Sequence, residues 1–377
     1  MSNETLSSEK TLTLFEALKQ LGDARDRRGK RHDLAFVLCG CVLAIMAGRS
    51  YVSSIHRFLR HRLRWLEEIT ETRVKRCVSR AQLPRILERV DWESLNHLLQ
   101  KHLGIQIQGS PGGEWIAIDG KALRGSPGEQ IVSARTHESQ IIVAQTRMAG
   151  KKSSEVSVVR ALLKASDLQG RKLTLDALHC NPETTALIHE NQGGFVIQVK
   201  ANQPHLLKLC HTLETQEPPL GSSQSVEKGH GRLEERQALF FPLPSKSLDP
   251  KWNQSGLQGL VRVERKTEEL TTKHLSREVS YYVTNQFLEA APGQREISQA
   301  IRQHWGVESY HWIRDVTFSE DKVRVKHSNQ SHILSLLRTC AIGIFKKVGG
   351  KNMRENLEKC SDSKEFFTQF LCQAGFL

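Results

Sequence analysis

The order of the predicted elements between residues 115 and 199 constrains the fold more than any other feature. Short apolar runs predict strands at 115–118, 131–136, 140–146, 172–175 and 195–199, with the second and third joined as a hairpin. Helical spacing at 155–163 and 182–190 separates the last three strands. Strands that alternate with helices form a sheet with helices packed against it. The sequence therefore predicts an α/β fold, a mixed sheet flanked by helices.

The segments on either side of this region have a different character. Residues 1–110 are predicted to be all-helical, with Asp33 and Asp91 as N-caps, and a linker rich in glycine follows at 109–113. Residues 113–345 are predicted to form the α/β domain, interrupted by a β-rich insertion at 204–290. Long helices are expected from about 294 to 312 and from 328 to 345, and residues 346–377 are expected to be a C-terminal tail.

The charge distribution favours a polyanionic partner. The 377 residues carry a net charge of +13 with neutral histidines, and residues 1–110 hold 19 Lys and Arg against 12 Asp and Glu, a local net of +7. Arg57, Arg60 and Arg64 have the spacing of one helical side, which predicts a helix that binds DNA in the major groove. The alternative is a solvated helix that packs on the α/β domain.

Several classes of protein are excluded. The longest apolar run, 34–48, is too short to span a bilayer, and no apolar segment of a secretory signal follows the polar residues 1–10. The eight cysteines include no C-x-x-C pair, so neither a zinc site nor a disulfide framework is expected. We therefore expect free thiols and a cytoplasmic location, with association to the nucleoid when DNA is bound.

Two carboxylates close predicted strands. Asp119 follows 115–118 and Asp176 follows 172–175, at the sheet edge where α/β proteins usually build their sites. Each alone is better explained as a helix cap or turn residue. Together, on neighbouring strands, they lie close enough to share a divalent cation, and oxygen ligands favour Mg²⁺ or Mn²⁺ over zinc.

A third carboxylate lies on the predicted helix near residue 308. Helical spacing places His304, Glu308, His311 and Asp315 on one face, so Glu308 is a candidate metal ligand. The alternative is a hydrogen-bonded interface between domains. The H-E-x-x-H spacing of zinc peptidases is absent.

Three motifs in this order resemble those of the H-repeat-associated (Rhs-linked) insertion-sequence transposases, which are DDE transposases with an RNase H-like core. They are A-I-D-G-K-A-L-R-G at 117–125, L-D-A-L-H at 175–179 and H-W-G-V-E-S-Y-H-W-I-R-D-V-T-F at 304–318. The similarity also includes 27–32, 47–51, 199–204 and 229–236, so it covers nearly the whole chain to about residue 345.

The resemblance implies that Asp119, Asp176 and Glu308 are the catalytic triad and the ligands of two divalent ions, Mg²⁺ or Mn²⁺. It implies cleavage at the ends of an insertion sequence and strand transfer by attack of a 3′-hydroxyl on target DNA. The implied partner is double-stranded DNA, at element ends and at target sites, with a homodimer on paired ends.

The chain departs from related patterns at a few positions. Ser309 stands where the family commonly has Asn beside the glutamate. Ile301, His304 and Asp315 occupy the spacings of the Tyr, Arg and Lys of a related, larger transposase group, so the details of strand transfer in that group do not carry over.

Basic residues in or beside the motifs are candidate contacts for DNA phosphates, with ordinary surface charges as the alternative. For His179 we expect a role in ordering the loop rather than metal ligation, and for Trp252 packing rather than stacking on an unpaired base. The candidate phosphate contacts are Lys121, Arg124, Lys200, Arg232 and Arg236.

Two other functions stay open. One is a domesticated relative that only binds DNA, against which the intact acidic triad argues. The other is an RNase H-fold nuclease of repair or defence that carries out no strand transfer.

Overall fold

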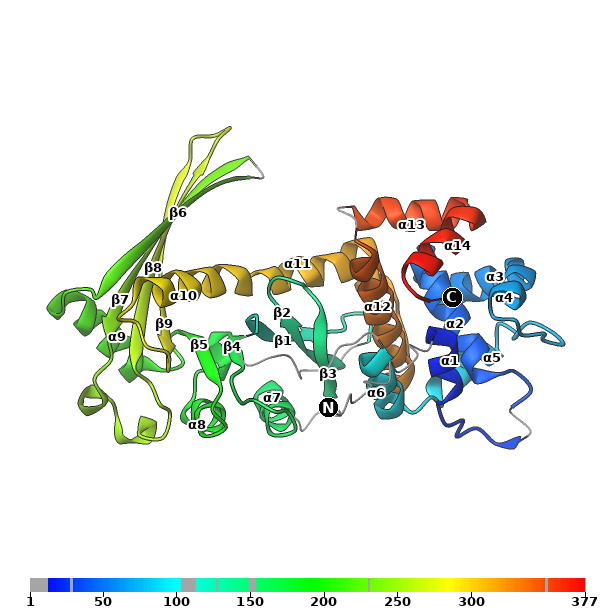
Figure 1. Ribbon diagram of the computed structural model, residues 1–377, viewed down its shortest axis with the longest axis horizontal. Coiled ribbons are helices and arrows are strands. Elements are labelled where there is room, and N and C mark those ends of the chain that lie inside the picture. The colour runs from blue at the N-terminus through cyan, green and yellow to red at the C-terminus, as the bar shows by residue number, and fades with distance from the viewer. Residues whose placement is uncertain are drawn as a thin grey trace, which may run out of the picture. The chain divides into compact units, whose positions relative to one another are not determined.

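The computed structural model describes residues 13–27, 30–102, 113–126, 128–148, 154–229, 231–349 and 352–376 (Figure 1). Contacts between residues divide the chain into two compact units, each made of segments that are distant in the sequence. One unit comprises 1–106, 122–131 and 311–377, and the other comprises 107–121 and 132–310. The predicted linker at 109–113 lies outside the described residues except for Gly113.

The N-terminal part of the first unit is helical, as expected. Asp33 accepts a hydrogen bond from the Phe36 amide at 2.7 Å, and Asp91 accepts one from the Ser94 amide at 2.9 Å, so both predicted N-caps are confirmed. The whole of α2 is buried, which makes it the centre of this unit. The helices are α1 (Leu14–Lys19), α2 (Leu34–Met46), α3 (Val52–His61), α4 (Leu63–Ile69), α5 (Gln82–Glu88) and α6 (Trp92–His102).

The basic helix expected around residues 55–66 is two helices. Arg62 lies between α3 and α4 with φ −106° and ψ 15°, outside the α-helical region, so the chain changes direction there. Arg57 and Arg60 therefore lie on α3 and Arg64 lies on α4, and all three side chains are exposed.

The C-terminal residues form helices that pack on this same unit. After α12 (Ser328–Val348), which contacts α2, α5 and α6, come α13 (Met353–Asp362) and α14 (Lys364–Gln373). The Trp65 ring lies 5.2 Å from the Phe367 ring, and the Trp65 Nε1–H donates to Thr368 Oγ1 at 3.1 Å. Residues 353–373 are thus two helices joined to the N-terminal helices by buried aromatic contacts.

The second unit is built around a mixed sheet, which confirms the expected fold class. The strand order is β3-β2-β1-β4-β5-β9-β8-β7-β6, with β1, β4 and β5 parallel and the strands beyond β5 antiparallel. Helices α7 (Glu155–Lys164) and α8 (Pro182–Glu190) connect β3 to β4 and β4 to β5. The first five strands are β1 (Ile116–Ala122), β2 (Gln130–Thr136), β3 (Ile142–Met148), β4 (Lys172–Leu175) and β5 (Gly194–Val199). This is the order of an RNase H-like sheet.

The insertion continues the same sheet. It begins with α9 (Pro204–Gln216), and its last strand, β9, pairs antiparallel with β5, with Ile197 opposite Val283. Trp252 is 2% exposed, in agreement with the packing role expected for it. The inserted strands are β6 (Gly221–Gly229), β7 (Arg232–Pro242), β8 (Gly259–Glu269) and β9 (Leu275–Thr284).

The long helix expected from 294 to 312 is interrupted. It comprises α10 (Ala291–His304) and α11 (Gly306–Trp312), followed by a π-helical turn at Ile313–Thr317. A π-turn adds a residue to the helical repeat, so Asp315 no longer follows the α-helical spacing from Glu308 that the sequence predicts. None of the helices in the described ranges is long and apolar enough to cross a membrane.

Candidate active site

Asp119 and Asp176 occupy adjacent strands at the same level of the sheet. β1 pairs in parallel with β4, and the last registered pair is Ile118 opposite Leu175. Asp119 and Asp176 are the next residues on each strand, and neighbouring strands lie about 4.8 Å apart. Asp119 lies within β1 rather than after its end as predicted, because β1 continues to Ala122.

A further acid, Glu155, joins this pair. Glu155 is the first residue of α7, and its Oε1 lies 3.3 Å from Nε2 of the buried His179. The same Nε2 lies 3.8 Å from Asp176 Oδ1. A Cβ at Gly120 would come within 2.4 Å of the Glu155 carboxyl carbon, so the glycine makes this close approach possible.

The sequence analysis missed Glu155. An acid after the N-cap Ser154 is the ordinary start of a helix, where it interacts with the helix dipole. No periodicity signals that this helix begins next to Asp119.

The electrostatics of the cluster favour a bound cation. Burial, followed by the negative charges of Glu155 and Asp176, raises the pKa of Asp119 to about 7. A divalent cation would relieve the repulsion between these carboxylates, and carboxylate oxygens are the ligands that Mg²⁺ and Mn²⁺ prefer. The donor set therefore fits such an ion, although no three acidic, His or Cys side chains among the described residues converge as a complete metal site.

A buried junction attaches α10 to β4. His304 Nδ1 and His137 Nε2 each lie 2.9 Å from Thr174 Oγ1. Burial lowers the pKa of both imidazoles to about 4, so both are neutral at physiological pH. The C-terminal end of α10 is thereby held against the residue that lies two positions before Asp176.

The contacts along α10 also give its direction. Glu296 Oε1 lies 2.6 Å from Lys172 Nζ at the start of β4, and His304 contacts Thr174 further along the strand. α10 therefore runs in the same direction as β4. Glu308 lies four residues beyond His304, on α11, after the interruption that separates α11 from α10. The Glu308 side chain is exposed.

The basic residues expected near the site differ in exposure. Lys121 is 7% exposed on β1. Arg124 has an 83% exposed side chain, 3.5 Å from Asp321. Lys200 is exposed directly after β5, and Arg232 is also exposed, 3.6 Å from Glu269.

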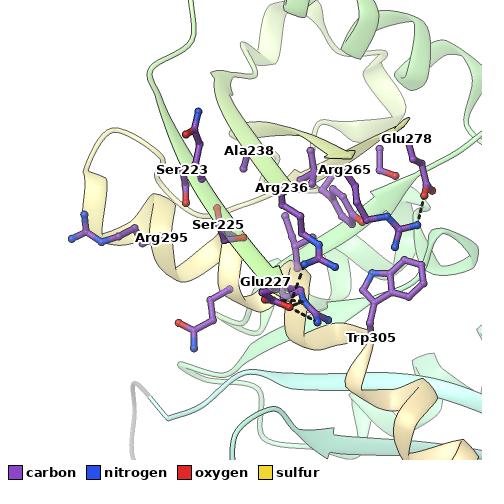
Figure 2. Close-up of a pocket in the computed structure, with 17 residues that line it drawn as sticks. Ser223, Ser225, Glu227, Arg236, Ala238, Arg265, Glu278, Arg295 and Trp305 are labelled. Atoms are coloured by element: carbon purple, nitrogen blue, oxygen red, sulfur yellow. Dashed lines mark hydrogen bonds and ion pairs between the residues drawn. The ribbon is translucent and has the colours of Figure 1, made fainter. Parts of the chain in front are cut away.

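Arginines of the insertion and of α10 line a pocket of about 300 Å³ between α10 and strands β6–β9 (Figure 2). Arg236 forms ion pairs with Glu227 and Glu234, and its side chain is only 15% exposed. Arg302 contacts Glu227 at 2.8 Å. Arg265 pairs with Glu278 and lies 5.5 Å from the Trp305 ring. Carboxylates therefore pair with three of the four arginines that line this pocket.

The RNase H-like sheet and its paired aspartates define the class of this protein, and comparisons with known proteins agree. The model of the transposase DDE domain matches residues 106–344, and that of a DDE_Tnp_1-associated domain matches residues 15–103. The chain belongs to the family of transposases with a DDE domain. Proteins of this family generally use divalent metal ions.

Curated relatives extend over most of the chain. A putative transposase, YncI, of Escherichia coli O157:H7 is 27% identical over 352 residues, covering 89% of this chain and 87% of the relative. The H repeat-associated putative transposase YhhI of Escherichia coli (strain K12) is 25% identical over 396 residues, covering 96% of this chain and 98% of the relative. The resemblance inferred from the three motifs is thus confirmed.

Proposed function

We propose that this DNA transposase cleaves DNA at the ends of an insertion sequence and transfers the resulting strand to target DNA. The observation that carries the proposal is the pair Asp119 and Asp176, adjacent on parallel strands, with the pKa of Asp119 raised to about 7. Such a concentration of negative charge is unfavourable in itself and is typical of a site that binds cations.

Asp119, Asp176 and Glu308 are the proposed ligands of two Mg²⁺ or Mn²⁺ ions. When bound, such ions offset the negative charge of the scissile phosphate and so lower the barrier to attack on it. The support for Glu308 is the course of α10, which the His304–Thr174 contact holds against β4. His179 contacts Glu155 and Asp176 together and orients both carboxylates.

The proposed reaction has two displacements at phosphorus. In cleavage, water forms a new P–O bond while the bond to the 3′-oxygen breaks, which leaves a 3′-hydroxyl on the element end and a 5′-phosphate on the flanking strand. In strand transfer, that 3′-hydroxyl attacks a phosphodiester of target DNA and displaces another 3′-oxygen. Neither displacement requires a covalent protein intermediate.

The proposed DNA contacts are the exposed cations. Arg57, Arg60 and Arg64 are exposed on α3 and α4, and Arg124 and Lys200 are exposed beside the catalytic motifs. Arg232 of the insertion is exposed as well, beside Glu269. Burial of Lys121 and the ion pairs of Arg236 make these two the weakest. We further propose a homodimer on paired ends, acting in the cytoplasm.

Cleavage of a plasmid that carries the gene with its natural flanking DNA tests the proposal. Asp119→Ala, Asp176→Ala and Glu308→Ala should each abolish Mg²⁺-dependent cleavage and leave DNA affinity within about twofold, because Lys and Arg supply most phosphate contacts. Asp315→Ala is the matched control and should retain most of the activity. Near wild-type cleavage by any triad variant would remove that residue from the site.

An assay with a pre-cleaved DNA end that carries a free 3′-hydroxyl distinguishes strand transfer from the two alternative functions. Joining of this end to a second duplex supports a transposase that carries out strand transfer. Cleavage without joining indicates a nuclease, and DNA binding without either reaction indicates a domesticated relative.

A further inference from the structure

A concentration of positive charge lies in the helical unit. A hollow of about 360 Å³ opens between the end of α2 and α3, and three of its six lining residues are arginines. The lining contains no carboxylate, in contrast to the pocket of the insertion. Its residues are Arg49, Ser54, Arg57, Phe58, His61 and Arg62.

None of the three arginines of this hollow forms an ion pair within 4 Å among the residues that the structure describes, although Arg62 lies close enough to Glu365 to help lower the pKa of that carboxyl. Arg49 and Arg57 are exposed, and Arg62 is half-buried. Like charges around one hollow repel one another, and a bound anion turns this repulsion into attraction. Guanidinium groups match phosphate particularly well, because their N–H donors bind two oxygens at once.

The C-terminal helices hold two of these arginines in place. Arg49 Nη2 donates to Ser361 Oγ at 3.0 Å, and Arg62 Nη2 donates to the Ser361 carbonyl at 3.1 Å. Ser361 is in the last turn of α13, where the carbonyls lack partners within the helix. A guanidinium has five N–H donors, so one bond to Ser361 orients it and leaves others for a ligand.

Ser361 is itself firmly positioned. Phe367 of α14 is 1% exposed and packs on Trp65, and Phe370 packs on Phe345 with ring centroids 5.3 Å apart. The turn between α13 and α14 is thus attached to the buried core of the unit.

We propose that Arg49, Arg57 and Arg62 bind a phosphodiester of the DNA backbone, and that α13 and α14 preorganise this site through Ser361. The inference rests on the proposed function only in taking DNA as the ligand. It assigns a binding role to residues 353–373, since they complete a site whose arginines come from the other end of the chain.

The test is the salt dependence of binding by the full-length protein to a fluorescein-labelled duplex of about 30 base pairs with arbitrary sequence. Each phosphate contact contributes roughly −0.9 to the slope of log affinity against log salt. Arg57→Gln should therefore weaken binding roughly fivefold and make the slope shallower by about one. Ser361→Ala, which changes no charge, should weaken binding about twofold through the loss of Arg49 orientation.

Arg354→Gln is the matched control, because Arg354 is exposed on α13, outside the hollow, and pairs with Glu358. It removes the same charge and should leave the slope unchanged. Thermal unfolding of each variant identifies any loss of folding, and Arg49→Gln is the second variant if Arg57→Gln is unstable.

An unchanged slope in folded Arg57→Gln and Arg49→Gln would overturn the inference. Thermal unfolding with inorganic phosphate gives a second readout. The inference would also be overturned if the substitutions abolished stabilisation of the protein by phosphate but left duplex binding unchanged, because the hollow would then be a site for free phosphate only. Failure of the wild-type protein to bind any duplex at low salt would overturn the proposed function together with this inference. Cleavage by wild type together with unchanged slopes in the variants would leave that function standing and reject this site alone.

Discussion

Gly120 and the two acids around it account for the unusual chemistry of Asp119. Because Gly120 has no side chain, the Glu155 carboxylate lies where a Cβ would otherwise be. That approach places a second negative charge beside Asp119, in addition to Asp176, in a partly buried setting. The three carboxylates thus form a cluster that destabilises the metal-free protein at neutral pH.

The pH dependence of stability should reveal this cluster. The pKa of Asp119 rises from 3.8 to about 7 on folding, so folded protein holds the proton more tightly than unfolded protein. The resulting stabilisation is complete below about pH 4 and is lost as the pH rises through 7. Asp119→Asn cannot ionise, so at pH 8 without metal it should unfold at a temperature roughly 3–8 °C above wild type.

At pH 4 the two proteins should unfold at nearly the same temperature. Asp167→Asn, an exposed substitution outside the cluster, should match wild type at both pH values. Added Mg²⁺ should stabilise wild type more than Asp119→Asn, since binding to the folded state raises its stability. Parallel pH curves for wild type and Asp119→Asn would contradict a raised pKa at this residue.

Helix α10 is positioned by side-chain contacts with β4 at two levels. Glu296 contacts Lys172 at the start of the strand, and His304 contacts Thr174 near its end. The helix is then interrupted after His304 and passes into a π-turn after Trp312. The placement of Glu308 therefore depends on the anchor at Thr174 rather than on one continuous helix.

Thr174→Val should disturb this anchor while preserving the shape of the side chain. It removes the hydroxyl that meets both imidazoles, and the loss of a buried hydrogen-bond partner costs about 1–3 kcal/mol of unfolding free energy. We expect a higher Mg²⁺ concentration for half-maximal cleavage and unchanged affinity for DNA. Thr174→Ser keeps the hydroxyl and should behave much like wild type. A Thr174→Val protein with wild-type stability and metal dependence would exclude a positioning role.

The first unit joins both ends of the chain through a buried ionic network. Arg314 is 0% exposed and contacts Glu320 at 2.7 Å, and Arg338 on α12 lies 3.6 Å from the same carboxylate. Arg338 also donates to the Ser50 carbonyl at 2.9 Å, just before α3. The segment after α11, the long helix α12 and the N-terminal helices are thus connected by a few charged groups.

Glu320→Gln should weaken this unit strongly. The substitution removes a negative charge that two buried guanidinium groups share, and breaking a buried ion pair on one side costs about 3–5 kcal/mol. Urea unfolding monitored by tryptophan fluorescence measures the change. Glu358→Gln, in an exposed pair with Arg354, should change the unfolding free energy by less than about 0.5 kcal/mol. A loss below about 1 kcal/mol for Glu320→Gln would show that the network contributes little.

Elements with strong local signals were predicted closely. Strand β4 and helix α8 have the expected bounds, because one is a compact apolar run and the other begins at Pro182 and ends before a pair of glycines. By contrast, β6 is a polar, serine-rich strand with little apolar alternation, so its extended form depends on pairing with β7. Helices α9, α13 and α14 were also missed, since their apolar positions are few or lie in a segment interpreted as a tail.

Local patterns were enough to specify the order of strands and helices, the caps at Asp33 and Asp91, and two aspartates at neighbouring strands. Strand alternation, helix capping and parallel pairing act over short stretches or follow general rules of sheet assembly. Packing between distant segments brought Glu155 to Asp119, placed α13 and α14 beside α3 and α4, and neutralised Arg236 with Glu227. Such contacts depend on how whole faces of helices and sheets pack together. The periodicity of a sequence does not indicate which distant charged residues will lie next to each other.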